Sequence, residues 1–236
     1  MNKPTKTYRK NAVIIGALFI FTMLSGMIDA YYVAPVFKNP ITNILPIDGK
    51  LLVGVFSILI MAVGIVFIAI TFFPVIKKQS ETIAITYVIL RSIECLLLIL
   101  GSICYLTIIA LRGVSLHEAD SSIYAIGITL ALKIKYYGYQ LAMILLGFGS
   151  LFLTYSLYKS KVIPRFLSIW GGIGYLFLLL SAVFDILGVI NTTSGLGFIL
   201  YIPGGLWELI VFPIWLFIKG FKIPINNKSE IRLQVD

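Results

Sequence analysis

The sequence predicts an all-α, polytopic membrane protein: a six-transmembrane-helix bundle with a short amphipathic external helix between helices three and four. Two observations predict this fold class. The 236 residues are 59% hydrophobic and only 12% charged, whereas soluble domains carry about 25% charged residues. The chain also contains six apolar runs of roughly 20 residues or more, the length that an α-helix needs to cross about 30 Å of hydrocarbon.

The whole chain, residues 1–236, is expected to form one integral membrane domain. The expected helices lie at about 12–33, 51–76, 82–111, 136–158, 166–190 and 198–218. The first carries Asp29 near its end, and the second holds no charge, so we expect the second to contact lipid most. The third carries Arg91 and Glu94 in its middle. An ionised side chain at the bilayer centre costs at least ~2.5–3.5 kcal/mol, so it persists only where it is paired, hydrated or used.

One face of the third helix gathers polar residues at helical spacing: Tyr87, Arg91, Glu94, Leu98, Gly101 and Tyr105. Residues that recur at i, i+4 and i+7 share one side of a helix. We therefore expect this face to look into the bundle.

The connection after the third helix ends in a second periodic pattern. Ile123, Ile126, Leu130 and Ile134 recur at amphipathic spacing, which predicts a short helix on the outer surface before the fourth span. The fourth and fifth spans are rich in small residues, as expected where helices pack closely in lipid. In the sixth span, Pro213 cannot donate a backbone hydrogen bond, which predicts a kink beside Glu208.

The basic residues predict the orientation of the chain. Most Lys and Arg residues lie before residue 12, in the second and fourth connections, or after residue 218. Because basic residues favour the cytoplasmic side, both termini of this multi-pass protein are expected in the cytoplasm, with the cell membrane as its location. The net charge of +9 then reflects contact with membrane lipids and predicts no nucleic-acid partner.

Residue counts along the helices predict two charged clusters. An inner cluster would join Arg91, Glu94 and Glu208 at mid-bilayer depth, with Tyr87 one turn away. A secondary outer cluster would gather near the other boundary: Asp29, Asp185, Lys133 and Lys135. The inner cluster has two interpretations. It is either a hydrated binding site, or a structural staple in which Arg91 pairs with Glu208 and fixes the third helix against the sixth. For the outer cluster the structural interpretation is favoured, because lysines and aspartates near the membrane boundary can reach water.

Catalytic and metal chemistry find little support in the residue types. The chain has a single histidine, His117, in a loop, whereas metal and haem sites use several converging ligands. We therefore expect no metal, no cofactor and no catalytic residue.

Several segments together resemble a bacterial integral membrane family, number 4386 among the domains of unknown function. They are Arg91-Ser-Ile-Glu94, the hairpin from Leu157 to Arg165, and the Pro203, Glu208 and Trp215–Gly220 pattern. The resemblance implies six transmembrane helices and a bacterial inner membrane, and it implies no reaction. Where many members have a histidine at the start of the fourth helix, this chain has Tyr136, which argues against a metal or proton role there.

Three hypotheses for the function remain open. The first is binding or transport of a small amphipathic or anionic molecule at the mid-membrane Arg and Glu residues. The second is a non-catalytic structural, accessory or immunity-type protein in which the charges are interhelix staples, with a homo-oligomer or a partner membrane protein. The third is a lipid-modifying enzyme with Glu94 or Glu208 as general base and Arg91 holding a phosphate.

Overall fold

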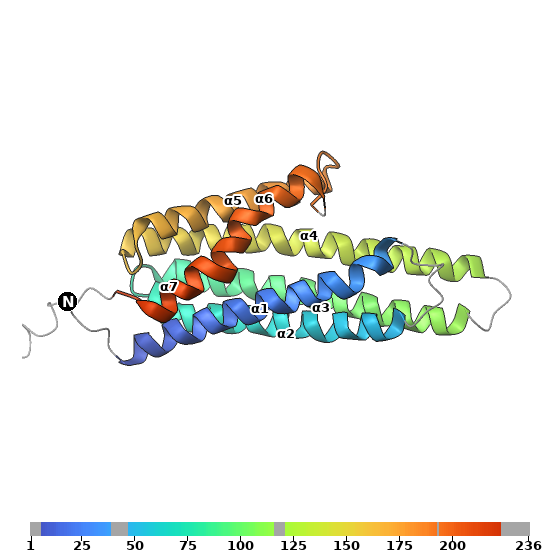
Figure 1. The fold of residues 1–236 in the computed structure, drawn as a ribbon, viewed down its shortest axis with the longest axis horizontal. Helices are drawn as coiled ribbons and strands as arrows, with labels where there is room; N and C mark the ends of the chain where they lie inside the picture. The colour runs from blue at the N-terminus through green and yellow to red at the C-terminus, as the bar shows by residue number, and fades with distance from the viewer. Residues whose placement is uncertain (1–5, 39–46, 116–120, 193, 223–236) are drawn as a thin grey trace, which may run out of the picture.

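The computed structural model of the chain describes residues 6–38, 47–115, 121–192 and 194–222. Within these ranges every regular element is helical (Figure 1). The elements are α1 Lys6–Lys38, α2 Ile47–Ile76, α3 Glu81–Ser115, α4 Ser121–Ser160, α5 Arg165–Ile186, α6 Gly195–Leu206, the π-helical turn η1 Trp207–Val211, and α7 Phe212–Ile218.

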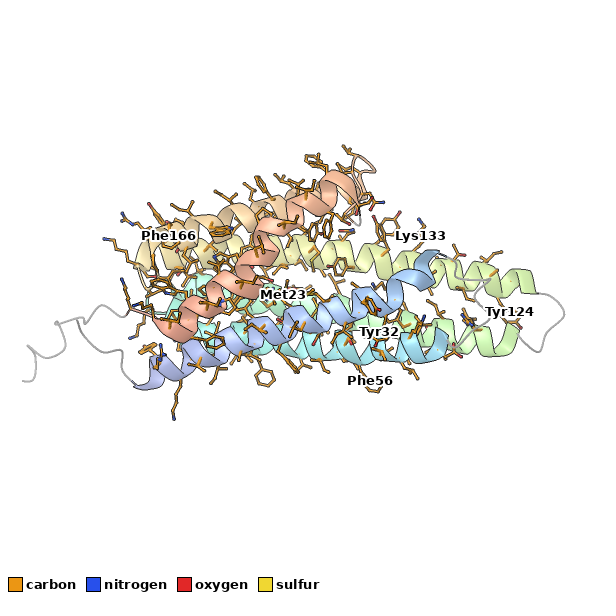
Figure 2. The ribbon with its side chains drawn as sticks, viewed as in Figure 1. Met23, Tyr32, Phe56, Tyr124, Lys133 and Phe166 are labelled. Carbon is orange, nitrogen blue, oxygen red and sulfur yellow. The ribbon has the colours of Figure 1, made fainter. Side chains whose placement is uncertain are left out.

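The six-helix membrane fold is confirmed. Six helical stretches are long and apolar enough to cross a membrane, and the sixth, Gly195–Ile218, combines α6, η1 and α7. Their outward surface is apolar, with Phe56 and Phe166 exposed at 62% and 61% (Figure 2). Such side chains are stable in lipid, which solvates apolar surface as well as a protein core does.

The helix predicted over residues 123–134 is present, but it is not a separate element. It continues into the fourth span as the 40-residue α4. A side chain at Gly127 would collide with Leu111 of α3, 2.9 Å away, so this part of α4 packs closely on α3. His117 lies outside the described residues.

Both ends of the described chain lie at the same end of the bundle, which we name the terminal end; the opposite end is the far end. Arg9 of α1 donates a hydrogen bond to the Phe217 carbonyl of α7. Just after α7, the Lys222 amide donates to the Val162 carbonyl between α4 and α5, at 2.7 Å. Consecutive spans are antiparallel neighbours (Figure 1), and α7 packs against α1 to close the bundle there.

The helices have unequal lengths. α3 and α4 contain 35 and 40 residues, whereas α5 contains 22. In Figure 1, α3 and α4 extend furthest at the far end, and the α5–α6 pair ends well short of them. α6 packs mainly on α5, whereas α7 packs on α1, so the sixth span leaves α1 as it approaches the far end.

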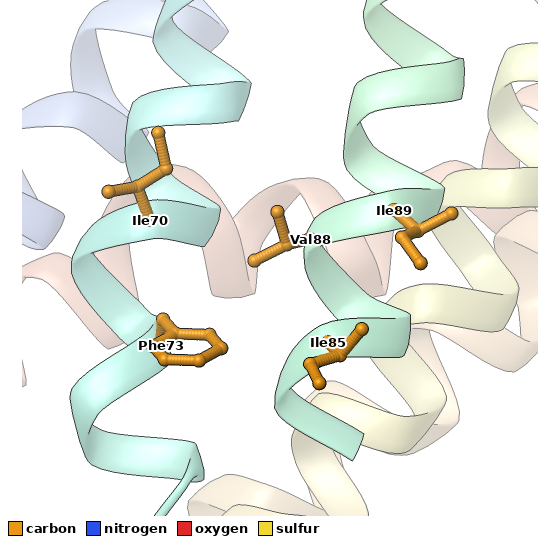
Figure 3. Close-up of a pocket in the computed structure, with 5 residues that line it drawn as sticks. All are labelled: Ile70, Phe73, Ile85, Val88 and Ile89. Atoms are coloured by element: carbon orange, nitrogen blue, oxygen red, sulfur yellow. The ribbon is translucent and has the colours of Figure 1, made fainter. Parts of the chain in front are cut away.

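A shallow groove lies on the surface between α2 and α3. Its volume is about 230 Å³, and its lining is apolar: Ile70, Phe73, Ile85, Val88 and Ile89 (Figure 3). A second groove runs along α4 beside Lys133. Neither groove contains Arg91, Glu94 or Glu208.

Candidate functional site

Arg91 and Glu94 form a buried ion pair within α3. Arg91 Nη1 lies 2.8 Å from Glu94 Oε2, and both residues are almost inaccessible. Their spacing of three residues places both side chains on one helix face. From the start of α3, Arg91 is roughly 15 Å and Glu94 roughly 20 Å along the helix axis, so the pair lies well inside the bundle.

Glu208 reaches the same region from the sixth span, where the backbone forms the π-helical turn. Pro213 has no N–H, so the α-helical bond to the carbonyl four residues earlier is absent. The Phe212 amide instead bonds the Trp207 carbonyl five residues back. This widened turn replaces the predicted simple kink and carries Glu208, which is 8% exposed.

Glu208 is held by α5 rather than by an ion pair. The Tyr175 hydroxyl donates to Glu208 Oε1 at 2.6 Å. Arg91 and Glu208 interact electrostatically, but the described residues contain no direct ion pair between them. The predicted ion pair between Arg91 and Glu208 is therefore replaced by two separate contacts. Arg91 pairs with Glu94 within α3, and Glu208 accepts a hydrogen bond from α5.

Tyr87 completes a group that we name the Arg91 cluster: Tyr87, Arg91, Glu94 and Glu208. The Arg91 guanidinium lies 5.8 Å from the centre of the Tyr87 ring. Three buried polar atoms of this cluster have no hydrogen-bond partner among the described residues: Tyr87 Oη, Arg91 Nε and Glu94 Oε1. Native proteins pair nearly all buried polar groups with protein, water or ligand, so these three atoms are exceptions that call for an explanation.

The residues predicted for the outer cluster separate into different environments. Asp29 of α1 lies 3.7 Å from Lys135 Nζ of α4, and the Tyr105 hydroxyl of α3 donates to Asp29 at 3.0 Å. Lys135 Nζ also lies over the Tyr105 and Tyr139 rings, 5.2 and 5.6 Å from their centres. This arrangement, the Asp29 cluster, joins three helices.

Asp185 has its own set of partners. It accepts hydrogen bonds from Tyr136, from Gln140 at 2.6 Å, and from the Thr192 hydroxyl and amide. This network ties the end of α5 to α4 and to the turn before α6. Lys133 belongs to neither group, because it is exposed on α4 (Figure 2).

Sequence reasoning missed Tyr175, Tyr139 and Gln140. Tyr175 follows a run of glycines, and such a run draws attention to close packing rather than to the tyrosine. Tyr139 is four residues after Lys135, and this i, i+4 spacing is a signal that would have identified it. Gln140 is a lone amide in an apolar helix, which also marks a polar contact between spans.

Comparison with known proteins places the chain by family alone. The model of the family described as Domain of unknown function (DUF4386) matches residues 14–220. No curated protein and no solved structure matches the chain. The match covers five of the spans in full, most of the first, and every residue of the Arg91 and Asp29 clusters, and this chain belongs to the DUF4386 family.

Proposed function

We propose that this membrane protein binds a small amphipathic molecule by an anionic or strongly polar head group at the Arg91 cluster, and carries it across the bilayer. The observation that supports this proposal is the set of buried, unpartnered polar atoms on Tyr87, Arg91 and Glu94. Two of them, Tyr87 Oη and Arg91 Nε, are hydrogen-bond donors. Oxygen acceptors of a phosphate, carboxylate or carbonyl group fit such donors.

The charges of the cluster favour entry of an anion together with a proton. One guanidinium faces two carboxylates, Glu94 and Glu208, and the hydroxyls of Tyr87 and Tyr175 are the neighbouring titratable groups. An anion competes with Glu94 for the guanidinium, and protonation of Glu94 removes that competition. We therefore expect the affinity for an anionic head group to rise as the pH falls.

The experiment is a thermal-unfolding series in non-ionic detergent with matched amphiphiles. An alkyl phosphate and a fatty acid are compared with an alcohol of the same chain length. The proposal expects a rise in Tm with the anionic amphiphiles that exceeds the effect of the alcohol, because binding to the folded state alone stabilises it.

Tyr87→Phe is the decisive variant. It removes a hydroxyl that makes no hydrogen bond within the described protein, so stability without ligand stays near wild type while the response to the anionic amphiphile is lost. Tyr155→Phe, on the exposed side of α4, keeps the full response. Equal responses in the wild type and in Tyr87→Phe would contradict the proposal.

The alternative, a structural or accessory protein, is favoured by a different observation. The hydrogen bond between Tyr175 and Glu208 and the contacts of Asp29 link separate helices. Glu208→Gln separates the two functions. If this variant unfolds at much lower temperature and no amphiphile shifts the wild-type Tm, the polar residues serve only to hold the helices together.

A further inference from the structure

We propose that water reaches the Arg91 cluster from the far end only, along a polar route through Lys135 and Tyr139, and that an aromatic layer closes the terminal end. The inference concerns access to the site described above, and it rests on the proposed function for its purpose. The access route is tested separately from ligand binding, by measuring where water lies in the bundle.

Contacts between α3 and α4 give the heights of Tyr139 and Lys135 relative to Glu94. Leu97 lies about one helical turn beyond Glu94 on α3, and its carbonyl lies 3.7 Å from the position that a Cβ of Gly138 on α4 would take. Tyr139 is therefore close to the height of Leu97. Gly101 lies against the Lys135 stem, 3.5 Å from its Cγ. At 1.5 Å per residue, these steps are roughly 5 and 6 Å along α3.

Tyr139 is within electrostatic range of both clusters. The carboxylates in that range are Asp29 of one cluster and Glu94 and Glu208 of the other. Lys135 lies over the Tyr139 ring. We therefore place Tyr139 on the route between the Asp29 cluster and the Arg91 cluster.

Unpartnered polar atoms continue beside this route. Tyr201 Oη of α6 and Gln140 Oε1 of α4 are buried without a hydrogen-bond partner among the described residues. A buried water typically makes about three hydrogen bonds to such otherwise unsatisfied groups, so water is the occupant that these atoms require.

The terminal half has a different composition. On the terminal side of the Arg91 cluster lie three buried aromatic side chains, the aromatic layer: Phe72, Phe212 and Phe221. Phe19 and Trp207 pack against this layer at the height of the cluster. Phe72 and Phe212 are stacked with ring centres 6.1 Å apart, and Trp207 is stacked on Phe212 at 4.2 Å. Phe72 also meets the Tyr87 ring edge-on at 6.2 Å. Phenylalanine rings offer water no hydrogen-bonding atom, so this layer would obstruct water beside the cluster, while the unpartnered Ser168 Oγ and Trp215 Nε1 lie nearer the terminal end.

Hydroxyl-radical footprinting of the wild-type protein tests the route without any substitution. X-ray radiolysis oxidises side chains that lie beside bound water, and tyrosine and phenylalanine have comparable intrinsic reactivity. We expect Tyr139 and Tyr201 to be oxidised several times faster than Phe72 and Phe212. Tyr155, which faces the detergent, gives the rate for a lipid-facing ring. Oxidation of Tyr139 no faster than that of Phe72 overturns the route.

Cysteine labelling in sealed vesicles tests its direction. In a background with Cys95→Ala and Cys104→Ala, Gly101→Cys has room beside Lys135, whereas Ser102→Cys faces α2, because Ser102 Oγ donates to the Val55 carbonyl. A membrane-impermeant thiosulfonate added on the far side should label residue 101 several times faster than residue 102, and addition on the terminal side should not. Equal labelling at both positions, or faster labelling of residue 101 from the terminal side, contradicts the proposal.

If the footprint is found but no amphiphile binds, the route stands and the proposed ligand is wrong.

Discussion

At the scale of single residues, Arg91 differs from a typical interhelix staple because its counter-ion, Glu94, lies on the same helix. An ion pair within one helix holds no second helix in place. It does neutralise a charge that would otherwise be too costly at this depth. The guanidinium can therefore exchange Glu94 for another anion without separating any pair of helices.

Removal of one member of this pair should be costly. Glu94→Gln leaves Arg91 buried without its anion, and breaking a buried pair in this way destabilises a protein by about 3–5 kcal/mol. The double variant Arg91→Met/Glu94→Leu should lose less than Glu94→Gln, because no unpaired charge remains. Thermal unfolding in detergent measures both, and a double variant that is less stable than the single variant would show that the pair stabilises the fold directly.

Gly54 makes room for the Asp29 cluster. A Cβ at this position would lie 2.7 Å from Val33 Cγ2, 2.9 Å from Asp29 Oδ1 and 3.0 Å from the Tyr105 ring. Gly54→Ala should therefore destabilise the bundle by about 1–3 kcal/mol, as overpacking does.

Gly49→Ala is the matched control on the same helix, because nothing lies within 4 Å of its Cβ position. It should stabilise α2 by about 0.5–1 kcal/mol, since alanine loses less backbone entropy than glycine in a helix. Unfolding curves of the two variants that coincide would refute the close packing at Gly54.

At the scale of elements, the sixth span consists of two helices with different neighbours, joined by the π-helical turn that holds Glu208. Such turns are rare and occur frequently at functional sites. Gly174 and Gly204 meet backbone to backbone just before the turn, where a side chain on Gly174 would lie 2.8 Å from the Gly204 Cα. α6 is thereby fixed on α5, and the turn determines where Glu208 points.

Pro213→Ala should convert the turn into regular α-helix, because alanine supplies the missing N–H. Glu208 would then rotate away from Tyr175. In the wild type, Tyr175→Phe should cost about 1.5–3 kcal/mol for a hydrogen bond to a charged group. In the Pro213→Ala background the same change should cost much less.

Pro74→Ala, within α2, is the control: it should leave the cost of Tyr175→Phe unchanged. Thermal unfolding of the four combinations of Tyr175 and Pro213 variants measures the coupling. A cost of Tyr175→Phe that is the same in both backgrounds would mean that Pro213 does not position Glu208.

At the scale of the whole molecule, the two ends of the described chain meet at one end of the bundle, together with most of its cations. The cations at this end, within or just beyond the last turns of the helices, include Arg9, Lys77, Lys159, Arg165 and Lys219. We infer from the positive-inside rule that this end faces the cytoplasm.

The orientation is tested with two C-terminal fusions. A green fluorescent protein fusion should fluoresce and an alkaline phosphatase fusion should be inactive, because the first matures in the cytoplasm and the second outside it. The opposite pattern would place the terminal end outside and would also reverse the sidedness expected for the Gly101→Cys labelling.

The helical fold followed from hydrophobic run lengths, because the bilayer sets a length that each span must reach. The polar face of α3 was also predictable: Tyr87, Arg91, Glu94 and Tyr105 are all buried, as their spacing indicates. Depth estimates along each helix placed Glu208 at the height of Arg91, because rise per residue is constant.

Partners across helices were not predictable in the same way. Lys133 and Lys135 are two residues apart and thus point in different directions, so only Lys135 faces Asp29. α2 holds no charge within the expected span, yet half of it is buried, and the sixth span is the least buried of the six. Absence of charge does not indicate lipid contact, because an apolar helix fits the centre of a bundle equally well.

The unequal lengths of the helices have a consequence for the surrounding membrane. α5 is roughly 33 Å long and α4 roughly 60 Å, so no bilayer of uniform thickness matches both. Lipids beside α5 and α6 meet a short wall, and those beside α3 and α4 meet a tall one. Either the lipid leaflet thins around part of the protein, or the α3–α4 hairpin protrudes from the membrane. A protruding hairpin would be a rigid site for attaching an antibody fragment, which would enlarge this small protein for electron microscopy.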